Sequence, residues 1–322
     1  MPADHESPPL RVLYRHYGGD GDKPRPAYYS KLLALVSLLR AAEALDNPPQ
    51  LVFLNDQVRP GPIRSLMEEY GEVLDVDGGS DARTYRFMLS REAARPGRPD
   101  QFLWFAEDDY LYRPNALRQL MLAVTALPDA DYLTMYGSST LDPVRSGPMA
   151  VERDTPGAAG NPTAISVDDT DWYRASQATS TFGTRLRTLR EDLRLLRTWA
   201  LTGGDWDGAT CMALSGYRPY SSADLLGDLF PGAHVPLGGK PKAIARGAVR
   251  LAATGLSLRP QARHRKIYAS DPEHILHMEI WDETTRFIPS ERTAAIDWES
   301  VATQTVEWAA EKGIAVPPLV AS

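Results

Sequence analysis

The chain has 322 residues, of which 43% are hydrophobic, and its 35 basic and 42 acidic residues give a formal net charge of -7. This apolar content suffices for a sizeable core and excludes wholesale disorder. The acidic balance argues against non-specific nucleic-acid binding, which needs a basic surface. Because Cys211 is the one cysteine, neither an intramolecular disulfide nor a multi-cysteine zinc site can form.

The N-terminal segment, residues 1–9, is polar and contains three prolines. It lacks the basic start and the apolar run of a signal peptide. The sequence also lacks a run of about 18 apolar residues, which a membrane span needs. We therefore expect a disordered tail over 1–9, no membrane span and a cytoplasmic protein, and the single cysteine fits a reducing compartment.

Strands and helices are predicted to alternate along residues 10–136. Runs rich in β-branched and aromatic residues that end at Gly, Asn or Asp predict strands, and apolar residues three and four apart predict helices. Such alternation implies a mostly parallel sheet with helices on both faces, which binds ligands beyond the carboxyl ends of its strands. The predicted elements are strand 11–17, helix 28–45, strand 51–54, helix 64–70, strand 72–76, helix 80–94, strand 101–106, helix 114–127 and strand 131–136.

The second half of the chain is less regular. Residues 137–170 are rich in Gly, Pro, Ser and Asp, which predicts a flexible loop or an insertion. A strand over 177–183 and an amphipathic helix over 184–201 are expected next. Residues 215–270 are predicted to be loop-rich, and a last helix is expected over about 297–312.

Three adjacent carboxylates, Glu107, Asp108 and Asp109, follow the apolar run 102–106. They are therefore expected at the carboxyl edge of the sheet. Because neighbouring carboxylates repel one another, we expect a compensating charge. Mg²⁺ or Mn²⁺ would supply it, since these ions take oxygen ligands and join carboxylates to a diphosphate. The alternative is a solvated acidic turn at the start of the next helix.

This strand followed by acids resembles the DxD metal motif of GT-A glycosyltransferases, especially the family 2-like and N-acetylglucosaminyltransferase I-like enzymes. In those enzymes a helix that begins near a proline follows, as at Pro114 here. Residues 81–89 resemble the family's helix that carries an Arg near the nucleotide. The resemblance covers roughly residues 10–215. It implies a Rossmann-like α/β fold of the nucleotide-diphospho-sugar transferases, with a mostly parallel sheet flanked by helices and a loop-rich C-terminal part. Residues 10–136 would bind the nucleotide sugar, and 171–322 would bind the acceptor and extend the single domain.

The resemblance also implies roles for individual residues. Asp109 would ligate the metal ion, and a basic segment near the C-terminus supplies His264 as a candidate further ligand. The aromatic candidates could instead be core or rim residues, and the charged ones could belong to turns or solvated helix faces. The nucleotide-sugar-binding candidates are Tyr14, Arg15, Tyr17, Asp56, Arg83, Glu107 and Asp108.

A second acidic pair, Asp205 and Asp207, lies in the glycine-rich loop 203–208. In inverting GT-A enzymes a carboxylate from this part of the chain accepts the proton of the acceptor hydroxyl, so either residue is a candidate base. Trp206 would stack on an acceptor ring. The alternative is a plain acidic turn with Trp206 as a core residue. His274 and His277 are expected on one helical turn and in a structural role.

The sequence therefore predicts transfer of a sugar from a nucleoside diphosphate sugar, UDP-type favoured, to a hydroxyl acceptor with inversion. The acceptor could be a small molecule, a glycan or a natural product. A nucleotidyltransferase that makes nucleotide sugars is one alternative, which the acidic character of the loop 18–22 disfavours. A non-catalytic nucleotide- or sugar-binding protein of the same fold is another.

Overall fold

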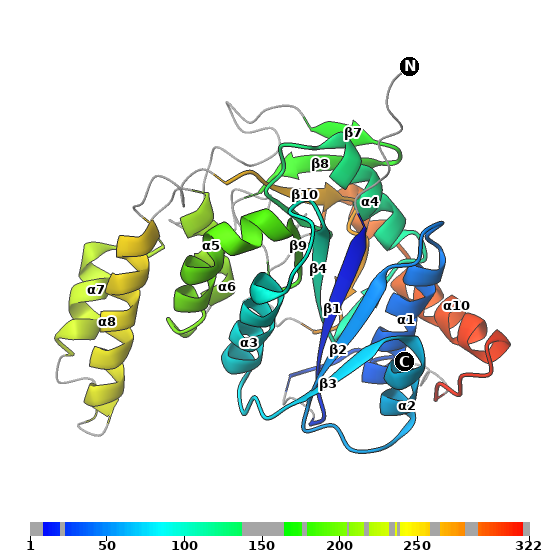
Figure 1. Cartoon of the computed structure of the whole chain (residues 1–322), viewed down its shortest axis with the longest axis horizontal. Coiled ribbons are helices and arrows are strands. Elements are labelled where there is room, and N and C mark those ends of the chain that lie inside the picture. Colours follow the sequence, from blue (N-terminus) through cyan, green and yellow to red (C-terminus); the bar gives the residue numbers. More distant parts are fainter. Residues whose placement is uncertain are drawn as a thin grey trace.

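A computed structural model describes residues 9–19, 23–136, 164–175, 179–204, 206–215, 219–231, 236, 239–257, 265–280 and 289–317. Its centre is a sheet of nine strands within these residues, with helices packed on both faces (Figure 1). None of the described helices is both long and apolar enough to cross a membrane.

The first half of the chain forms the predicted elements in the predicted order. The Ser80 side chain accepts a hydrogen bond from the backbone N–H of Arg83, so it caps the helix that the sequence predicts there. One short strand, β5, was not predicted. The elements are β1 (Leu10–Tyr17), α1 (Lys31–Glu43), β2 (Gln50–Asp56), α2 (Pro62–Tyr70), β3 (Glu72–Val76), α3 (Asp81–Ala94), β4 (Phe102–Glu107), β5 (Tyr110–Tyr112), α4 (Ala116–Ala126) and β6 (Tyr132–Thr134).

The second half contains more regular structure than the sequence predicts. The predicted loop 137–170 is wrong at its C-terminal end, where a strand begins at Ile165; residues 137–163 lie outside the described part. The elements are β7 (Ile165–Val167), β8 (Thr170–Arg174), β9 (Phe182–Arg185), α5 (Leu186–Trp199), α6 (Trp206–Leu214), α7 (Ser222–Leu229), α8 (Lys240–Ser257), β10 (Ile267–Asp271), β11 (Ile275–His277), α9 (Glu291–Ala294) and α10 (Trp298–Glu311).

The prediction that 215–270 is loop-rich is also wrong, because α7, α8 and β10 lie there. Pro241 is compatible with α8 because it stands in the first turn, where its missing N–H costs no hydrogen bond. Gly247 stands in the interior of α8, next to α7. It lets α8 approach α7, since a Cβ at this position would lie 2.8 Å from the Cβ of Asp228.

The order of strands in the sheet is β3-β2-β1-β4-β9-β6-β10-β8-β7. Parallel pairing joins β3, β2, β1 and β4, and also β6 and β10. β9 and β8 run in the opposite direction, so seven of the nine strands point the same way. The predicted fold class, a mostly parallel α/β sheet flanked by helices, is confirmed. Because β9 is reversed, residues just before it lie beside the end of β4.

Side chains that alternate along the strands form a core on each face of the sheet. Val12 and Tyr14 of β1 face the core shared with α1, α2 and α4, whereas Leu13 faces the core shared with α3, α5 and α6. Figure 1 shows these helix groups on opposite sides of the sheet. The two cores fix the strand ends, and with them the residues that follow.

We expect Gly183→Ala to destabilise the protein by about 1–3 kcal/mol, because added core atoms force neighbours to move. A Cβ at Gly183 in β9 would lie 2.5 Å from the Phe102 ring of β4. Gly227→Ala in α7 is the matched control, since nothing lies within 4 Å of its Cβ position. It should be neutral or stabilising by up to about 1 kcal/mol. Chemical denaturation measures both, and equal stabilities would contradict the packing of β9 on β4.

Candidate active site

The acidic triplet lies at the carboxyl edge of the sheet, as predicted. Arg15 of β1 stands opposite Glu107 of β4, and Tyr17 stands opposite Asp56 of β2. The carboxyl ends of three parallel strands therefore meet at one edge. Each acid of the triplet then turns to a different set of partners.

Glu107 forms an ion pair with the buried Arg15. The Arg15 guanidinium contacts Glu107 and Asp81 and donates to Ser180 Oγ at 3.2 Å, while its own side chain is only 7% exposed. Thr181 Oγ1, just before β9, donates to Glu107 Oε2 at 3.1 Å. Burial raises the pKa of Glu107 above its usual value, although the Arg15 charge opposes this. Arg15 is therefore a buried support for Glu107, and its predicted contact with a nucleotide stays a prediction.

Asp108 is bound by residues at the end of β1 and at the start of α1. Its Oδ2 accepts from the backbone N–H of Tyr17 at 2.9 Å and lies 2.8 Å from His16 Nδ1 and 3.0 Å from Lys31 Nζ. Burial acts to raise the pKa of Asp108, but His16 and Lys31 outweigh it and the pKa is lowered. Asp108 is thus held as a carboxylate.

Asp109 points to the opposite side, toward β11. Its Oδ2 lies 3.0 Å from His277 Nε2 and accepts from Arg25 Nη2 at 3.1 Å. His277 stacks on Tyr110 at 4.8 Å, and Glu279 Oε2 lies 3.5 Å from His277 Nε2. Burial opposes ionisation, but His277 and Arg25 lower the pKa of Asp109 well below its usual range.

The crowding of the three acids is therefore balanced by protein cations, which the sequence did not predict. Among the described residues, no group of three His, Cys, Asp or Glu side chains is arranged to hold a metal ion. Asp109 and His277 still have the chemistry of metal ligands, because a carboxylate oxygen and an imidazole nitrogen lie together there. Mg²⁺ and Mn²⁺ sites commonly use one or two protein ligands and complete their shell with phosphate oxygens and water.

Two nucleotide-binding candidates have internal partners. Tyr14 is fully buried and packs edge-on against Phe53, so it belongs to the core and does not line the site. Asp56 is 4% exposed; its Oδ1 accepts from the Gly78 N–H at 3.1 Å and its Oδ2 from Thr84 Oγ1 at 3.2 Å. Asp56 thus ties the end of β2 to the start of α3.

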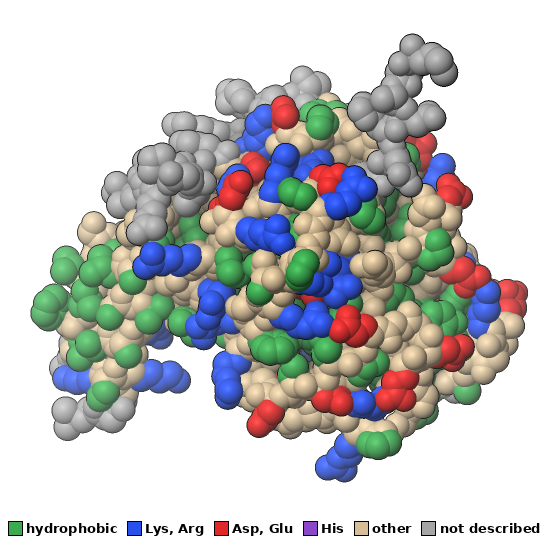
Figure 2. All heavy atoms as spheres, in the orientation of Figure 1, with side chains coloured by type: hydrophobic (Ala, Val, Ile, Leu, Met, Phe, Trp, Pro, Cys, Tyr) green, Lys and Arg blue, Asp and Glu red, His purple; other side chains and the backbone are tan. Residues whose placement is uncertain are grey.

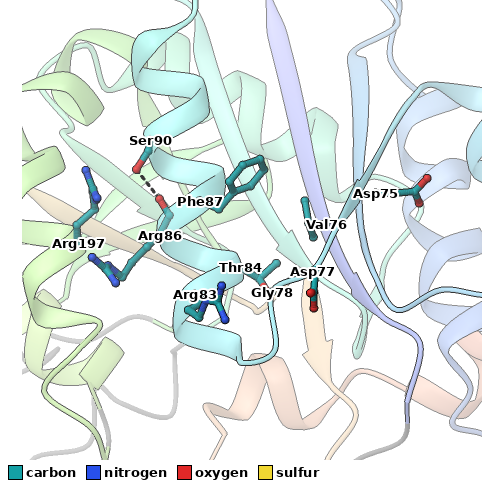
Figure 3. Close-up of a pocket in the computed structure, with 10 residues that line it drawn as sticks. All are labelled: Asp75, Val76, Asp77, Gly78, Arg83, Thr84, Arg86, Phe87, Ser90 and Arg197. Atoms are coloured by element: carbon teal, nitrogen blue, oxygen red, sulfur yellow. Dashed lines mark hydrogen bonds between the residues drawn. The ribbon is translucent and has the colours of Figure 1, made fainter.

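The other two candidates are accessible. The Tyr17 side chain is 46% exposed, and Lys31 Nζ lies 5.3 Å from its ring centre. Arg83 on α3 lines a hollow of about 590 Å³ beside the Asp56 contacts (Figure 3). Arg86, Arg197 and the half-exposed Phe87 ring also line this hollow. Asp75, which pairs with Arg64, and Asp77 line it too, but the three arginines have no carboxylate within 4 Å among the residues that the structure describes, which leaves them available to an anionic ligand.

The second acidic pair is described only in part. Asp205 lies outside the described residues, and Asp207 is half-buried in the first turn of α6. Trp206 packs on Tyr85 with ring centres 4.7 Å apart, and Arg15 lies 5.7 Å from the same Tyr85 ring. Burial raises the pKa of Tyr85, and the charges of both Asp207 and Glu107 add to this. The two acidic segments therefore converge around Tyr85.

The histidines in the site differ from the prediction. His264 lies outside the described residues. His277, expected on a helical turn, lies instead on β11, which pairs with β5 directly after the acids and so brings it to Asp109. His16, at the end of β1, contacts Asp108, and its position at the end of a predicted strand was the available signal. The pairing of β11 with β5, which places His277, had no signal in the sequence.

No protein-family model matches this chain, and no curated protein does. Among solved structures, S. aureus TarS 1-349 in complex with UDP is 12% identical with a TM-score of 0.39, over 79% of this chain and 82% of that chain. CMP:2-keto-3-deoxy-manno-octonic acid synthetase complexed with CTP is 10% identical with a TM-score of 0.37, over 93% and 99%. Mouse xyloside xylosyltransferase 1 is 14% identical with a TM-score of 0.37, over 63% and 81%. Similarity at these scores assigns no reaction to this chain.

We expect acid to destabilise the protein through His274. This side chain is fully buried between Arg113 and Thr170, and burial with the Arg113 charge lowers its pKa to about 3. Because the unfolded His binds a proton near pH 6.5 and the folded one does not, its stabilising effect is present above pH 6.5 and is lost as the pH falls. Between pH 7 and pH 5 this loss is about 2 kcal/mol.

Denaturant titrations at pH 7 and pH 5 on the wild type and His274→Gln measure this effect. The wild type should lose about 2 kcal/mol more than the variant over that interval. An identical pH dependence in both proteins would contradict the role given to His274.

Proposed function

We propose that this protein is a glycosyltransferase that moves a sugar from a nucleoside diphosphate sugar to a hydroxyl acceptor. One observation carries the proposal. Asp109 and His277 are in direct contact at the carboxyl edge of a mostly parallel sheet, with Arg25 and Lys31 beside the acids. A carboxylate, an imidazole and two cations at such an edge suit a metal-bound diphosphate.

In this proposal Asp109 and His277 would hold Mn²⁺ or Mg²⁺, and His277 replaces His264 as the candidate second protein ligand. When bound, the ion stabilises the negative charge that develops on the leaving diphosphate. Arg25, which donates to Asp109, and Lys31, which lies on Asp108, are near enough to donate to phosphate oxygens as well. Arg83 adds a third cation from the rim of the hollow.

The nucleoside is held by groups at the ends of β1, β2 and β4. The exposed Tyr17 ring offers a surface on which a base can stack. Asp108 accepts from a ribose hydroxyl, and Glu107, positioned by Arg15, accepts from the ribose or the donor sugar. Asp56 contributes by fixing Gly78 and Thr84 behind the hollow, and a UDP-type base remains the favoured donor.

The acceptor hydroxyl loses its proton to a carboxylate at the start of α6. Asp207 is the candidate base among the described residues; it lines a small cavity together with Tyr85, on which its neighbour Trp206 packs. The acceptor oxygen then forms a bond to C1 of the sugar as the bond from C1 to the diphosphate breaks. Attack from the face opposite the leaving group inverts the configuration at C1. Trp206, which packs on Tyr85, borders the acceptor side.

A nucleotidyltransferase is a second candidate, and the cations that follow β1 favour it. Lys31 and Arg25 gather at the acids, where they could bind the phosphates of a nucleoside triphosphate. Release of pyrophosphate from a nucleoside triphosphate and a sugar phosphate would identify this activity. Release of a nucleoside diphosphate from a nucleotide sugar would identify the first.

We expect Asp109→Asn and His277→Gln each to abolish the Mn²⁺-dependent thermal stabilisation by a nucleoside diphosphate. A ligand at 100 times its Kd stabilises by about 2.7 kcal/mol, which a melting curve resolves. Asp100→Asn is the control, because Asp100 is an exposed acid that pairs with Arg98. A full Mn²⁺-dependent shift in both site variants would remove the metal role from this pair.

We expect Asp207→Asn to lower kcat by about 100-fold or more while leaving donor affinity within a few-fold of the wild type. The reason is that a general base acts in the transition state and does not hold the donor. Steady-state kinetics with donor titration measure both quantities. Parallel losses in kcat and in donor affinity would point to a structural role for Asp207.

A further inference from the structure

Helices α7 and α8 form a pair at one end of the molecule, next to α5 (Figure 1). They lie away from the acidic triplet, and the proposed reaction gives them no role. Their side chains nevertheless follow a clear pattern. An ordinary surface helix turns apolar side chains inward and charged ones toward solvent, whereas here a charged contact joins the two helices and large apolar side chains face solvent.

The contact between the two helices is polar. Asp228 of α7 is 8% exposed, and its carboxylate accepts from Arg246 at 2.7 Å and from Arg250 at 2.6 Å, both on α8. Gly247 sits against Asp228 at the closest approach of the helices. Charged side chains therefore pair between α7 and α8, on the side where a surface helix usually buries apolar ones.

The side of the pair that faces solvent is apolar. Phe230, at the end of α7, is 76% exposed, Leu226 is 57% exposed, and Leu251 of α8 is 52% exposed. The exposed residues recur three, four, seven or eight positions apart, so on each helix they share one face. We call this the outer face; it consists of Ala223, Leu226, Gly227 and Phe230 on or next to α7, and Ile244, Ala248, Leu251, Ala252 and Gly255 on α8.

The outer face is accessible in the protein described. Outside its own helix backbone, neither Gly227 nor Gly255 has an atom of the described residues within 4 Å of a Cβ built on it. Figure 2 shows hydrophobic side chains gathered over α7 and α8, with basic side chains at the lower end of the pair. An apolar face of this kind, exposed on the side opposite the Asp228–Arg250 pair, indicates a surface that is covered when the protein works.

The charge of the pair indicates what covers it. Residues 219–257 hold four basic and two acidic side chains, in a chain whose net charge is -7. Asp228 is neutralised by its two arginines, and Asp224 belongs to the capping box of Ser221. Lys240 and Lys242, at the start of α8, have no carboxylate within 4 Å among the described residues. An acidic protein thus presents a locally basic, apolar face.

We propose that the helix pair α7–α8 binds the surface of an anionic membrane. Leu226, Phe230 and Leu251 enter the boundary between headgroups and acyl chains. Lys240, which is four residues before Ile244 and so shares its face, contacts anionic headgroups, and Lys242 adds a second positive charge at the start of α8. Helices with Leu and Phe on one face and basic residues at its border bind membranes in this way, without spanning them. A face two helices wide suits an extended surface better than a single peptide. The proposal is independent of the reaction proposed above.

The test is flotation of the full-length protein with phosphatidylcholine vesicles, with and without phosphatidylglycerol. The wild type should bind the anionic vesicles, and binding should weaken as salt is raised. Phe230→Ser and Leu251→Ser should each lower the partition coefficient roughly tenfold or more, since each removes a large apolar side chain from the interface. Lys240→Gln combined with Lys242→Gln should remove the preference for anionic vesicles.

Ile165→Ser is the matched control. Ile165 is a 40% exposed apolar residue on β7, the edge strand of the sheet, which lies apart from α7 and α8 in Figure 1. It should bind vesicles like the wild type. Phe230→Ser and Leu251→Ser should melt at the wild-type temperature, since both side chains are exposed in the free protein. Absence of wild-type binding, or equal loss in Ile165→Ser, would overturn the proposal. So would a lipid-free dimer, seen by light scattering, that Phe230→Ser dissociates, because a second copy would then cover the outer face.

Discussion

The structure at the carboxyl edge depends on one electrostatic constraint, which is that three consecutive carboxylates must each find their own positive partner. Arg15 lies beneath Glu107, His16 and Lys31 bind Asp108, and Arg25 with His277 binds Asp109. These partners come from β1, the segment after it, α1 and β11. The constraint therefore ties together parts of the chain that are more than 250 residues apart.

The same arrangement separates the acids by their chemistry. The pKa of Glu107 is raised by burial, whereas the pKa values of Asp108 and Asp109 are lowered because their histidine and cationic partners outweigh burial. Two carboxylates whose ionised form is favoured, next to a less acidic one, suit a site that binds a cation and a hydroxylated ligand at once. The reversed strand β9 supports this division, since it delivers Ser180 and Thr181 to Arg15 and Glu107.

The helix pair shows a second way in which charge decides structure. Asp228 of α7 pairs with Arg246 and Arg250 of α8, while Leu226, Phe230 and Leu251 lie on the exposed side of the same two helices. At the carboxyl edge of the sheet, the charged side chains surround the candidate site. In the helix pair, Asp228 and its arginines form the contact between the two helices. The membrane surface that we propose as partner would cover these apolar side chains and offer anionic groups to the nearby lysines.

The sequence by itself determined the alternation of strands and helices through residue 136 and the place of the acids after β4. Those features follow from local periodicity, from caps such as Ser80 and from the apolar run before Glu107. It did not reveal α8, because Pro241 and Gly247 resemble helix breakers until the first-turn position and the contact with Asp228 are known.

Only the tertiary structure decided which side chains meet the acids. Tyr14 and Tyr17 look alike in sequence, but the alternation of β1 buries the first in the core and the second lies at the exposed end of the strand. His277 reaches Asp109 because β11 pairs with β5, a long-range contact without a local signal. Periodicity records which face of an element is buried, whereas the neighbours of a strand end are set by pairing between distant segments.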